Sequence, residues 1–473
     1  MSALSGPHDS DREWAPELST PSFDCDSVAK PNPGSHDATL LGLAQRLPHE
    51  LLAEIFLIGL NKLNAKYQSC AAVNIYLARL TAVCASWRSI AILTPMLWSK
   101  IHCVEYSAHN ISNRAAFAKL QLERSANVLL DLELTPGFPP DIVSTAKMII
   151  ILYPHLHRCR TITLGFQSEG DPEALLPLPG PLKHLTSLTI LDTHGSFHER
   201  TIITDTETPI LRHLEYTGRL TALRALRTGS LNHIRLHGVT LGDAMGFLSK
   251  CPAAQSVMIA PRLKNSDVYP KPFTLNDLTT VGIPRRLFTV FQHIVKTPRL
   301  EELCLFSLNN IVSLPGLSGS QVPPLQSLER LTLLNTRLLR CSGRLYDFMA
   351  SHPGIEQLTL YHCCDPIVIS AMLVNPDKGR AYWPLLRRLQ LPEDHEPLLP
   401  SLRMLRFEHT QGRLTANKLL GACMIDLLEA RPALSFAASK HSFGDSEVSL
   451  GEVEARFRHR FVKTPYEQPI SMP

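Results

Sequence analysis

Two apolar segments near the start of this 473-residue chain decide how its first part folds: RLPHELLAEIFLIGL at residues 46–60 and YLARLTAVCASWRSIAILTPMLWSKI at residues 76–101. Both repeat apolar residues at the three-to-four spacing of an amphipathic helix. These residues are Leu51, Leu52, Ile55, Phe56 and Leu60, then Leu77, Leu80, Val83, Cys84, Trp87 and Ile90. Pro48 suits the first helical position, because the N–H it lacks would go unpaired there. We therefore expect two short helices, the second ending before Pro95, with irregular chain at residues 61–75 between them.

The order of these residues resembles the F-box: Leu-Pro, a helix with Leu-Leu and Ile-Phe, Val-Cys shortly before Trp-Arg, and then Leu-Trp. The matching residues are Leu47, Pro48, Leu51, Leu52, Ile55, Phe56, Leu80, Val83, Cys84, Trp87, Arg88, Leu97 and Trp98. The departure is the long segment between the two helices. Similar insertions occur in F-box proteins of mushroom-type (basidiomycete) fungi, as does a segment similar to ERSANVLLDLEL at residues 123–134. The alternative is a small helical core that binds no partner.

This resemblance implies the function of an exchangeable substrate receptor in an SCF-type cullin–RING ubiquitin ligase. The F-box would dock on a Skp-type adaptor, which connects to the cullin and the RING protein. The implied adaptor-binding residues are Leu47, Pro48, Leu51, Leu52, Ile55, Phe56, Leu80, Val83, Cys84, Trp87, Leu97 and Trp98. Such a receptor is not an enzyme; it contributes proximity by holding a target protein near the ubiquitin-conjugating enzyme. The rival interpretation is an interaction scaffold that binds the adaptor without promoting ubiquitin transfer, and a more distant one is a hydrolase with a cryptic site.

A second pattern recurs from about residue 145 onward: a leucine-like residue, two others, an apolar residue, one other and an apolar residue. Examples begin at Leu185, Leu211, Leu300, Leu328 and Ile355. The central apolar residues of all copies are Ile162, Leu188, Leu214, Ile234, Val257, Val281, Leu303, Leu331, Leu358, Leu389 and Leu405. Most intervals between them match the roughly 20–29-residue period of leucine-rich repeats. The last two intervals are uneven, which indicates a shifted or missing boundary near Leu389.

Helical patterns that finish at a proline precede several of these strands, at residues 285–298, 344–353 and 417–432. Each unit is then a helix, a turn and a short strand, and stacked units give a solenoid with a parallel sheet on its concave side. The predicted fold is α/β: a small all-helical F-box module followed by a leucine-rich-repeat-like solenoid with a curved parallel sheet. The alternative is an ordinary α/β domain with coincidental leucines.

Composition along the chain suggests five regions. Residues 1–38 are rich in Ser, Pro and Asp and are expected to be disordered. The F-box module is expected at residues 40–104, a connecting region at 105–144, and the substrate-binding repeats at 145–436. Residues 437–473 form a polar and basic tail, containing Arg456, Arg458, His459, Arg460 and Lys463, for which a solvated charge run is favoured over a capping element.

Several function classes find no support in the sequence. A net charge of +4 without clustered Lys and Arg gives no case for nucleic acid. The eleven cysteines include no C-x-x-C pair, as expected of reduced core cysteines in a cytoplasmic or nuclear protein. We expect no signal peptide, membrane span, cofactor or metal. The two weak metal candidates are His155, His157 and Cys159, and the run from His362 to Asp365, which we interpret as a turn with one buried cysteine.

A surface remains as the candidate target site. In each predicted strand the residue between the two apolar positions points away from the core. The resulting rows carry basic side chains that could receive an acidic or phosphorylated peptide. The candidates are Arg330, Arg388, Arg406, His213, His233 and Arg235. We expect the first three to approach one another near the C-terminal end of the sheet, with Arg388 and Arg406 in neighbouring repeats. Ordinary solvation of an exposed face is the alternative. The sequence does not identify the target or a required modification.

Overall fold

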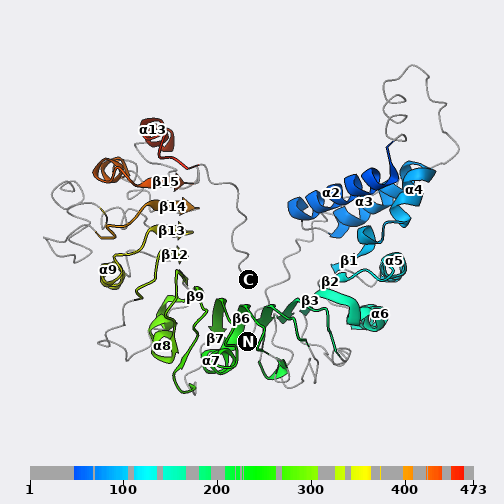
Figure 1. Ribbon diagram of the computed structural model, residues 1–473, viewed down its shortest axis with the longest axis horizontal. Coiled ribbons are helices and arrows are strands. Elements are labelled where there is room, and N and C mark those ends of the chain that lie inside the picture. Colours follow the sequence, from blue (N-terminus) through cyan, green and yellow to red (C-terminus); the bar gives the residue numbers. More distant parts are fainter. Residues whose placement is uncertain are drawn as a thin grey trace, which may run out of the picture.

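Thirteen parallel strands form one continuous, curved sheet in the computed structural model of the chain (Figure 1). The strands follow one another in sequence order, and a separate two-stranded pair stands beside them. The structure describes residues 47–67, 70–104, 111–135, 142–166, 181–192, 208–218, 220–223, 226, 228–262, 269–306, 325–335, 342–363, 373, 398–408, 422, 424–438 and 449–462.

The strands are short, as a solenoid of short units requires. In the large sheet they are β1 (Lys100–Val104), β2 (Leu130–Thr135), β3 (Cys159–Phe166), β4 (Ser187–Asp192), β5 (His213–Thr217), β6 (His233–Thr240), β7 (Ser256–Arg262), β9 (Thr280–Pro284), β11 (Glu302–Phe306), β12 (Arg330–Leu334), β13 (Gln357–Tyr361), β14 (Met404–Glu408) and β15 (Ser435–Ala438). The separate pair is β8 (Phe273–Thr274) and β10 (Val295–Lys296).

One apolar residue from each strand lies in register across the whole sheet. The row is Ile101, Leu132, Ile162, Leu188, Leu214, Ile234, Val257, Val281, Leu303, Leu331, Leu358, Leu405 and Phe436. Each of these side chains is at most 3% exposed. A solenoid unit cannot bury its leucines alone, so this shared row is what makes the stack one cooperative core. The predicted parallel sheet is confirmed, and so is the register of the repeat motif from Ile162 to Leu358.

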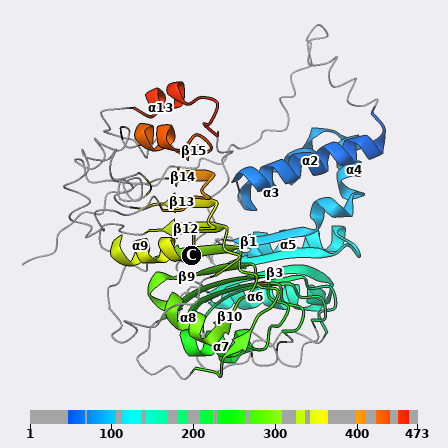
Figure 2. The ribbon, with the colours of Figure 1, turned by 60° about the vertical axis from the view of Figure 1, so that its left-hand side comes forward.

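Helices cover the outer side of the curve, and the strands line its inner side (Figures 1 and 2). They are α5 (Ile111–Arg124), α6 (Ile142–Leu152), α7 (Leu241–Leu248), α8 (Phe288–Ile294) and α9 (Ser342–Ser351), with 3-10 turns η2 (Tyr153–Arg158), η4 (Leu220–Leu223) and η5 (Arg285–Leu287). Local capping begins α7, where the Thr240 hydroxyl accepts a hydrogen bond from the Asp243 N–H. The helix predicted at residues 285–298 is shorter than expected, because residues 295–296 form β10. The helix predicted at 344–353 is α9, and residues 424–430 of the third are helical.

A helical module precedes the sheet and lies at one end of the curve (Figure 1). It contains α2 (His49–Tyr67), α3 (Cys70–Val83), α4 (Ala85–Ile92) and the 3-10 turn η1 (Pro95–Trp98). Three sequence expectations were wrong here. Pro48 precedes the helix instead of starting it, and its carbonyl accepts the Leu52 N–H. The segment expected to be irregular, residues 61–75, is helical at 61–67 and 70–75. The second expected helix divides in two at Cys84.

The sheet begins earlier than expected. Strand β1, at the end of the module, pairs with β2, and β2 pairs with β3. The region from 105 to 144, expected to connect two domains, therefore supplies α5 and β2 to the same stack. Ile101 and Leu132 continue the apolar row, so the solenoid starts at Lys100 and not near residue 145.

The copy of the motif centred on Leu389 does not enter the sheet where it was expected. Strand β13 pairs directly with β14, with Leu358 opposite Leu405. Residues 386–391 lie outside the described residues. No strand from these residues therefore lies between β13 and β14.

The C-terminal residues cap the stack, which had been the less favoured interpretation, while Arg456, Arg458 and His459 of the predicted charge run are exposed. Helix α13 (Leu450–Arg456) begins with a capping box between Ser449 and Glu452. Phe461 bridges to Phe436 of β15, which covers the open edge of the last strand. Arg460 donates hydrogen bonds to the carbonyls of Arg431 and Leu428, both at 2.8 Å. Arg456 pairs with Glu429, whereas Lys463 lies outside the described residues.

Candidate functional site

Each helix of the module buries one face and exposes another. On α2 the buried face carries Leu52, Phe56 and Leu60, spaced by four residues so that they stack along one side. They join α3, α4 and η1 in a core that is separate from the sheet's own core. The rings of Phe56 and Trp87 approach to 4.9 Å between centroids. Apart from Phe117 of α5, which packs against it, this small core is formed by residues of the module, and the exposed apolar residues of the module are not part of it.

Exposed apolar side chains concentrate on this module. They are Leu47, Leu51, Ile55, Ile58, Ile75, Val83, Ile92, Leu93 and Met96, and we call this set the apolar module surface. Among the described residues, the large hydrophobics of similar exposure elsewhere are Ile150, Ile210 and Tyr269. On α2, Leu51, Ile55 and Ile58 follow at helical spacing and are 46–52% exposed. Exposed apolar side chains that gather on one small module are typical of an interaction surface.

The residues implied by the F-box resemblance divide between this surface and the core. Leu52, Phe56, Leu80, Leu97 and Trp98 are each at most 5% exposed. They support the module and do not offer side chains to a partner, which corrects the expectation that all twelve make contact. Leu47, Pro48, Leu51, Ile55 and Val83 are exposed, and Cys84 and Trp87 are half-buried. Ile58, Ile75, Ile92, Leu93 and Met96 were missed; their apolar character at positions facing away from the core was the available signal.

Cys84 has a local structural role. It lies between α3 and α4 with an extended backbone, and its sulfur accepts the Trp87 N–H at 3.4 Å. A cap of this kind satisfies one of the unpaired donors at a helix start. Arg88 then donates to the Thr81 carbonyl at 2.7 Å, which holds α4 against α3. These contacts orient the Trp87 ring toward Phe56.

Trp98 connects the module to the sheet. Its indole N–H donates to the Ala91 carbonyl at 2.7 Å, and the Arg124 guanidinium of α5 lies 4.4 Å above its ring. Burial lowers the pKa of Arg124, with Glu123 opposing the effect. Since β1 begins two residues after Trp98, the module has no flexible linker to the sheet.

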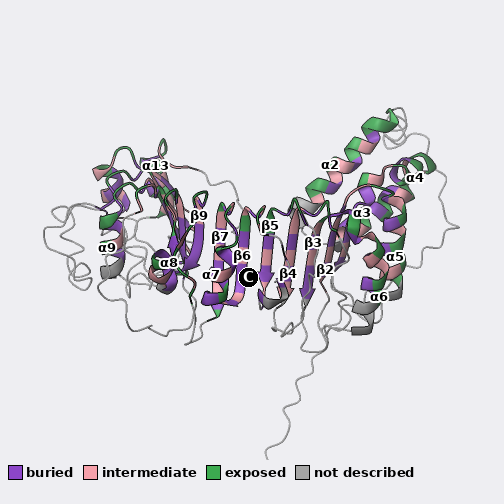
Figure 3. Ribbon diagram, turned by 60° about the horizontal axis from the view of Figure 1, so that its bottom comes forward, coloured by how far each residue is buried: buried purple, intermediate pink, exposed green. Residues whose placement is uncertain are grey.

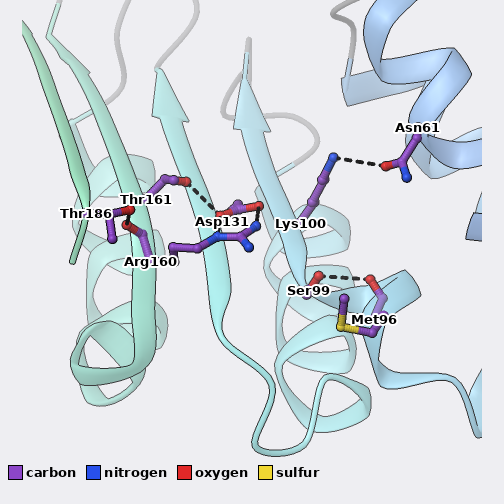
Figure 4. Close-up of polar contacts among 8 residues, drawn as sticks. All are labelled: Asn61, Met96, Ser99, Lys100, Asp131, Arg160, Thr161 and Thr186. Carbon is purple, nitrogen blue, oxygen red and sulfur yellow. Dashed lines mark hydrogen bonds and ion pairs between the residues drawn. The ribbon is translucent and has the colours of Figure 1, made fainter. Parts of the chain in front are cut away.

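Polar contacts across the first strands add to this connection (Figure 4). The Lys100 ammonium donates to the Asn61 side chain at 3.4 Å, and the Ser99 hydroxyl donates to the Met96 carbonyl. Asp131 on β2 accepts from Arg160 and Thr161, the Arg160 contact measuring 2.7 Å. The side-chain hydrogen bond to Asp131 raises the pKa of Arg160. The orientation of the module relative to the first strands is therefore fixed by packing and hydrogen bonds together.

The three arginines expected to cluster on the inner face do not form one free basic site. Arg330 on β12 lies within 3.4 Å of Glu302 and 3.6 Å of Glu301. Arg406 lies on β14, two strands from Arg330. In register, Arg406 pairs with Thr359 of β13, whereas Arg330 pairs with Gln357 of the same strand. Arg388 lies outside the described residues. Because the neighbours of β14 are β13 and β15, no strand carrying Arg388 is next to that of Arg406. The prediction that Arg388 and Arg406 lie on adjacent strands was therefore wrong.

The other predicted residues do come together, where β5 lies beside β6. His213 and His233 are directly opposite in register, and their rings stack with centroids 4.6 Å apart. Glu215 and Arg235 form the next pair along the same two strands. Burial, His213 and Arg235 lower the pKa of His233. His237 follows on β6, 3.9 Å from Glu215, and burial lowers its pKa to about 4.

Three buried cysteines are held in the protonated form, and no metal site is found among the described residues. Burial raises the pKa of Cys159, Cys251 and Cys304 to about 12, so all three stay protonated at neutral pH. Among the described residues no group of three or more His, Cys, Asp or Glu is placed to hold a metal ion. Burial lowers the pKa of His155, and His157 binds a backbone carbonyl. Cys363 is buried, as predicted, whereas 364–365 lie outside the described residues. None of the described helices is long and apolar enough to cross a bilayer.

Comparison with known proteins identifies no family. No family model matches the chain, and no curated protein matches it. A Bacteroides fragilis protein of known crystal structure is similar over 63% of this chain and 70% of its own, at 14% identity and a TM-score of 0.26. A TM-score this low supports no conclusion about fold or function. The geometry of the two surfaces is therefore the basis for assigning a role.

Proposed function

We propose that this chain is the substrate receptor of an SCF-type cullin–RING ubiquitin ligase. The observation that carries the proposal is the apolar module surface. Its side chains are exposed, and the core of the helical module is formed without them. The F-box resemblance of residues 47–98 supplies the partner: a Skp-type adaptor, which connects to the cullin and the RING protein. Burying exposed Leu, Ile, Val and Met side chains against an adaptor stabilises the complex by roughly 25 cal/mol for each Å² of apolar area.

The sheet has the complementary role of holding a target protein. Its curved inner face presents three side-chain positions from most strands, in fixed register, and so offers an extended surface of the kind that solenoids use for binding. The chain would then contribute to ubiquitin transfer by proximity alone, because the fixed junction at Trp98 sets the distance between adaptor and target. No covalent chemistry by this chain is needed.

We expect Leu51→Ser with Ile55→Ser to abolish capture of the adaptor. Both side chains are about half exposed, so the double variant should stay folded, while truncating anchors in an interface costs roughly 2 kcal/mol or more each. The measurement is co-purification of the tagged full chain with a co-expressed Skp-type adaptor. Ile150→Ser is the matched control, because Ile150 is 66% exposed on α6 outside the module.

The outcomes separate the possible functions. Undiminished adaptor capture by the folded double variant would move the interface away from α2. Capture of the adaptor without cullin by the wild-type chain would favour the scaffold interpretation over a ligase receptor.

A further inference from the structure

Cations at the strand starts of the sheet fall into two groups. Most of them lie beside a carboxylate. Arg160 contacts Asp131 at 2.7 Å, and the other paired arginines are Arg299 with Asp277, Arg330 with Glu301 and Glu302, and Arg403 with Glu356, at 3.4–3.7 Å. Their charges are largely neutralised within the chain, so they attract an anionic partner weakly.

Arg212 and Arg235 belong to the second group. Neither forms an ion pair with any carboxylate in the part of the chain that the structure describes. Arg212 immediately precedes β5, and its carbonyl accepts the N–H of His233 at the start of β6. His213 and His233 stack beside it, and both are exposed. Figure 3 shows how buried residues alternate with half-buried ones along the strands of the sheet. We call Arg212, His213, His233 and Arg235 the basic rim.

Other charges near the basic rim do not cancel it. On β5 and β6 they are Glu215, which is half-buried, and His237, whose two ring nitrogens have no hydrogen-bond partner. Level with the basic rim, strand β7 offers Ser256 and Met258 and strand β4 offers Ser187 and Thr189, none of which is charged. The carboxylate of β4, Asp192, is the last residue of that strand. Arg262 ends β7, and Lys183 and His184 precede β4. With neutral histidines the two arginines exceed Glu215, and protonation of His233 adds further positive charge.

We infer that the basic rim binds an Asp/Glu-rich segment of the target protein. The inference rests on the proposed receptor function, and it places the target at β5–β6 instead of the C-terminal strands. The cations belong to two adjacent strands and to successive positions along them, so they suit several separate carboxylates better than one compact dianion. In an extended segment, the side chains on one face repeat at about 6.6 Å. Residues two apart on a strand of the basic rim, such as His233 and Arg235, have the same spacing along the chain.

The stacked histidines make the binding depend on pH. In the free chain burial, and then His213 and Arg235, disfavour the imidazolium of His233, so its pKa lies below the ordinary value. A docked carboxylate favours the imidazolium, so binding takes up protons and strengthens as pH falls from 7.5 to 5.5. His237, with a pKa of about 4, stays neutral over this window, and glutamate carboxylates, with a pKa of roughly 4.3, stay ionised.

The test is a fluorescence anisotropy titration of the full chain with a labelled twelve-residue peptide of alternating Glu and Ser. We expect Arg212→Gln with Arg235→Gln to weaken binding about tenfold or more. Arg299→Gln with Arg403→Gln, which removes the same charge from paired positions, should change it by less than about twofold, because paired surface charges contribute little. Equal weakening by the two double variants would overturn the site and leave only a net-charge effect.

Three further arms complete the test. The same peptide with Gln for Glu should not bind, and its binding would overturn the role of carboxylates. A phosphoserine peptide of equal net charge that bound tenfold tighter would replace the carboxylate site by a phosphate site. His213→Gln with His233→Gln should remove the rise in affinity at pH 5.5, and a persisting rise would exclude the pair as the proton acceptor. Adaptor capture by every variant should be unchanged, which separates failure here from failure of the proposed function.

Discussion

Leu331→Asp is expected to unfold the solenoid. Leu331 is 1% exposed and lies between Leu303 and Leu358 in the apolar row. Truncating a buried leucine to alanine costs roughly 2–5 kcal/mol through lost transfer energy and the cavity. A carboxylate at this position has no partner, and an uncompensated buried charge adds roughly several kcal/mol. Because typical domains are stable by only about 5–15 kcal/mol, the variant should be largely insoluble or molten.

Thr332→Asp is the control for this prediction. Thr332 is the next residue on the same strand, but it is half-exposed on the inner face of the sheet. A charge there stays in water, so the expected loss of stability is about 1 kcal/mol or less. Thermal unfolding of the purified full chain, followed by circular dichroism, checks both variants. A melting temperature of Leu331→Asp equal to that of Thr332→Asp would contradict the shared core.

Trp98→Ala is expected to destabilise the module and the first strands together. The substitution leaves a large cavity, removes the hydrogen bond to Ala91, and takes away the ring beneath Arg124. Replacing a buried tryptophan by alanine costs roughly 3–5 kcal/mol. Since β1 follows directly and Phe117 of α5 packs on the module core, loss of the module should also expose the edge of the sheet. Hydrogen exchange should then accelerate at residues 100–104 as well as in α2–α4.

Trp98→Phe, the matched variant, keeps most of the packing and loses the N–H donor, so its effect should be smaller. If Trp98→Ala accelerated exchange in the helices alone, the module and the sheet would be independent units. That result would remove the fixed junction on which the proximity argument depends.

Repeat spacing predicted the sheet well because one physical requirement acts on every unit. A strand in this stack must bury two side chains toward the helices, so its apolar residues recur at fixed positions whatever the surrounding sequence. The same requirement is met by Ile101 and Leu132. Strand β1 was missed because its residues were assigned to the F-box, whereas the alternation at the end of residues 123–134 indicated a strand that was placed in a connection and not in the sheet. Leu389 shows the converse, since its sequence matches the pattern whereas β13 pairs directly with β14.

Features set by tertiary contacts could not be predicted in this way. The break at Cys84 depends on a sulfur cap, and a continuous apolar stripe through Val83 and Trp87 concealed it. Gly59 of α2 leaves room for the Tyr76 hydroxyl of α3, because an added Cβ would overlap the hydroxyl oxygen. The charged tail residues predicted solvation, yet Arg460 makes its bonds to backbone carbonyls that only the folded stack presents.

The candidate site residues, too, could be predicted by residue type but not by their tertiary contacts. Residue type identified Leu51, Ile55, His213 and His233 as candidates. Burial then separated Leu51 from its neighbour Leu52, which the helical spacing alone had placed on one stripe. Ion pairing separated Arg235 from Arg330, because the carboxylates that neutralise Arg330 come from the preceding strand: Glu302 begins β11 and Glu301 immediately precedes it. Ion-pair partners on neighbouring strands cannot be predicted until the register of the strands is known.

The most direct test of the central claim is a calorimetric titration of the full wild-type chain with a purified Skp-type adaptor, repeated at several temperatures. If the apolar module surface is the docking site, the two proteins form a one-to-one complex with a negative heat-capacity change, which is the mark of buried apolar area. The heat-capacity change should disappear with binding in the Leu51→Ser and Ile55→Ser double variant. Absence of binding by the folded wild-type chain would contradict the assignment of this protein as an adaptor-linked receptor.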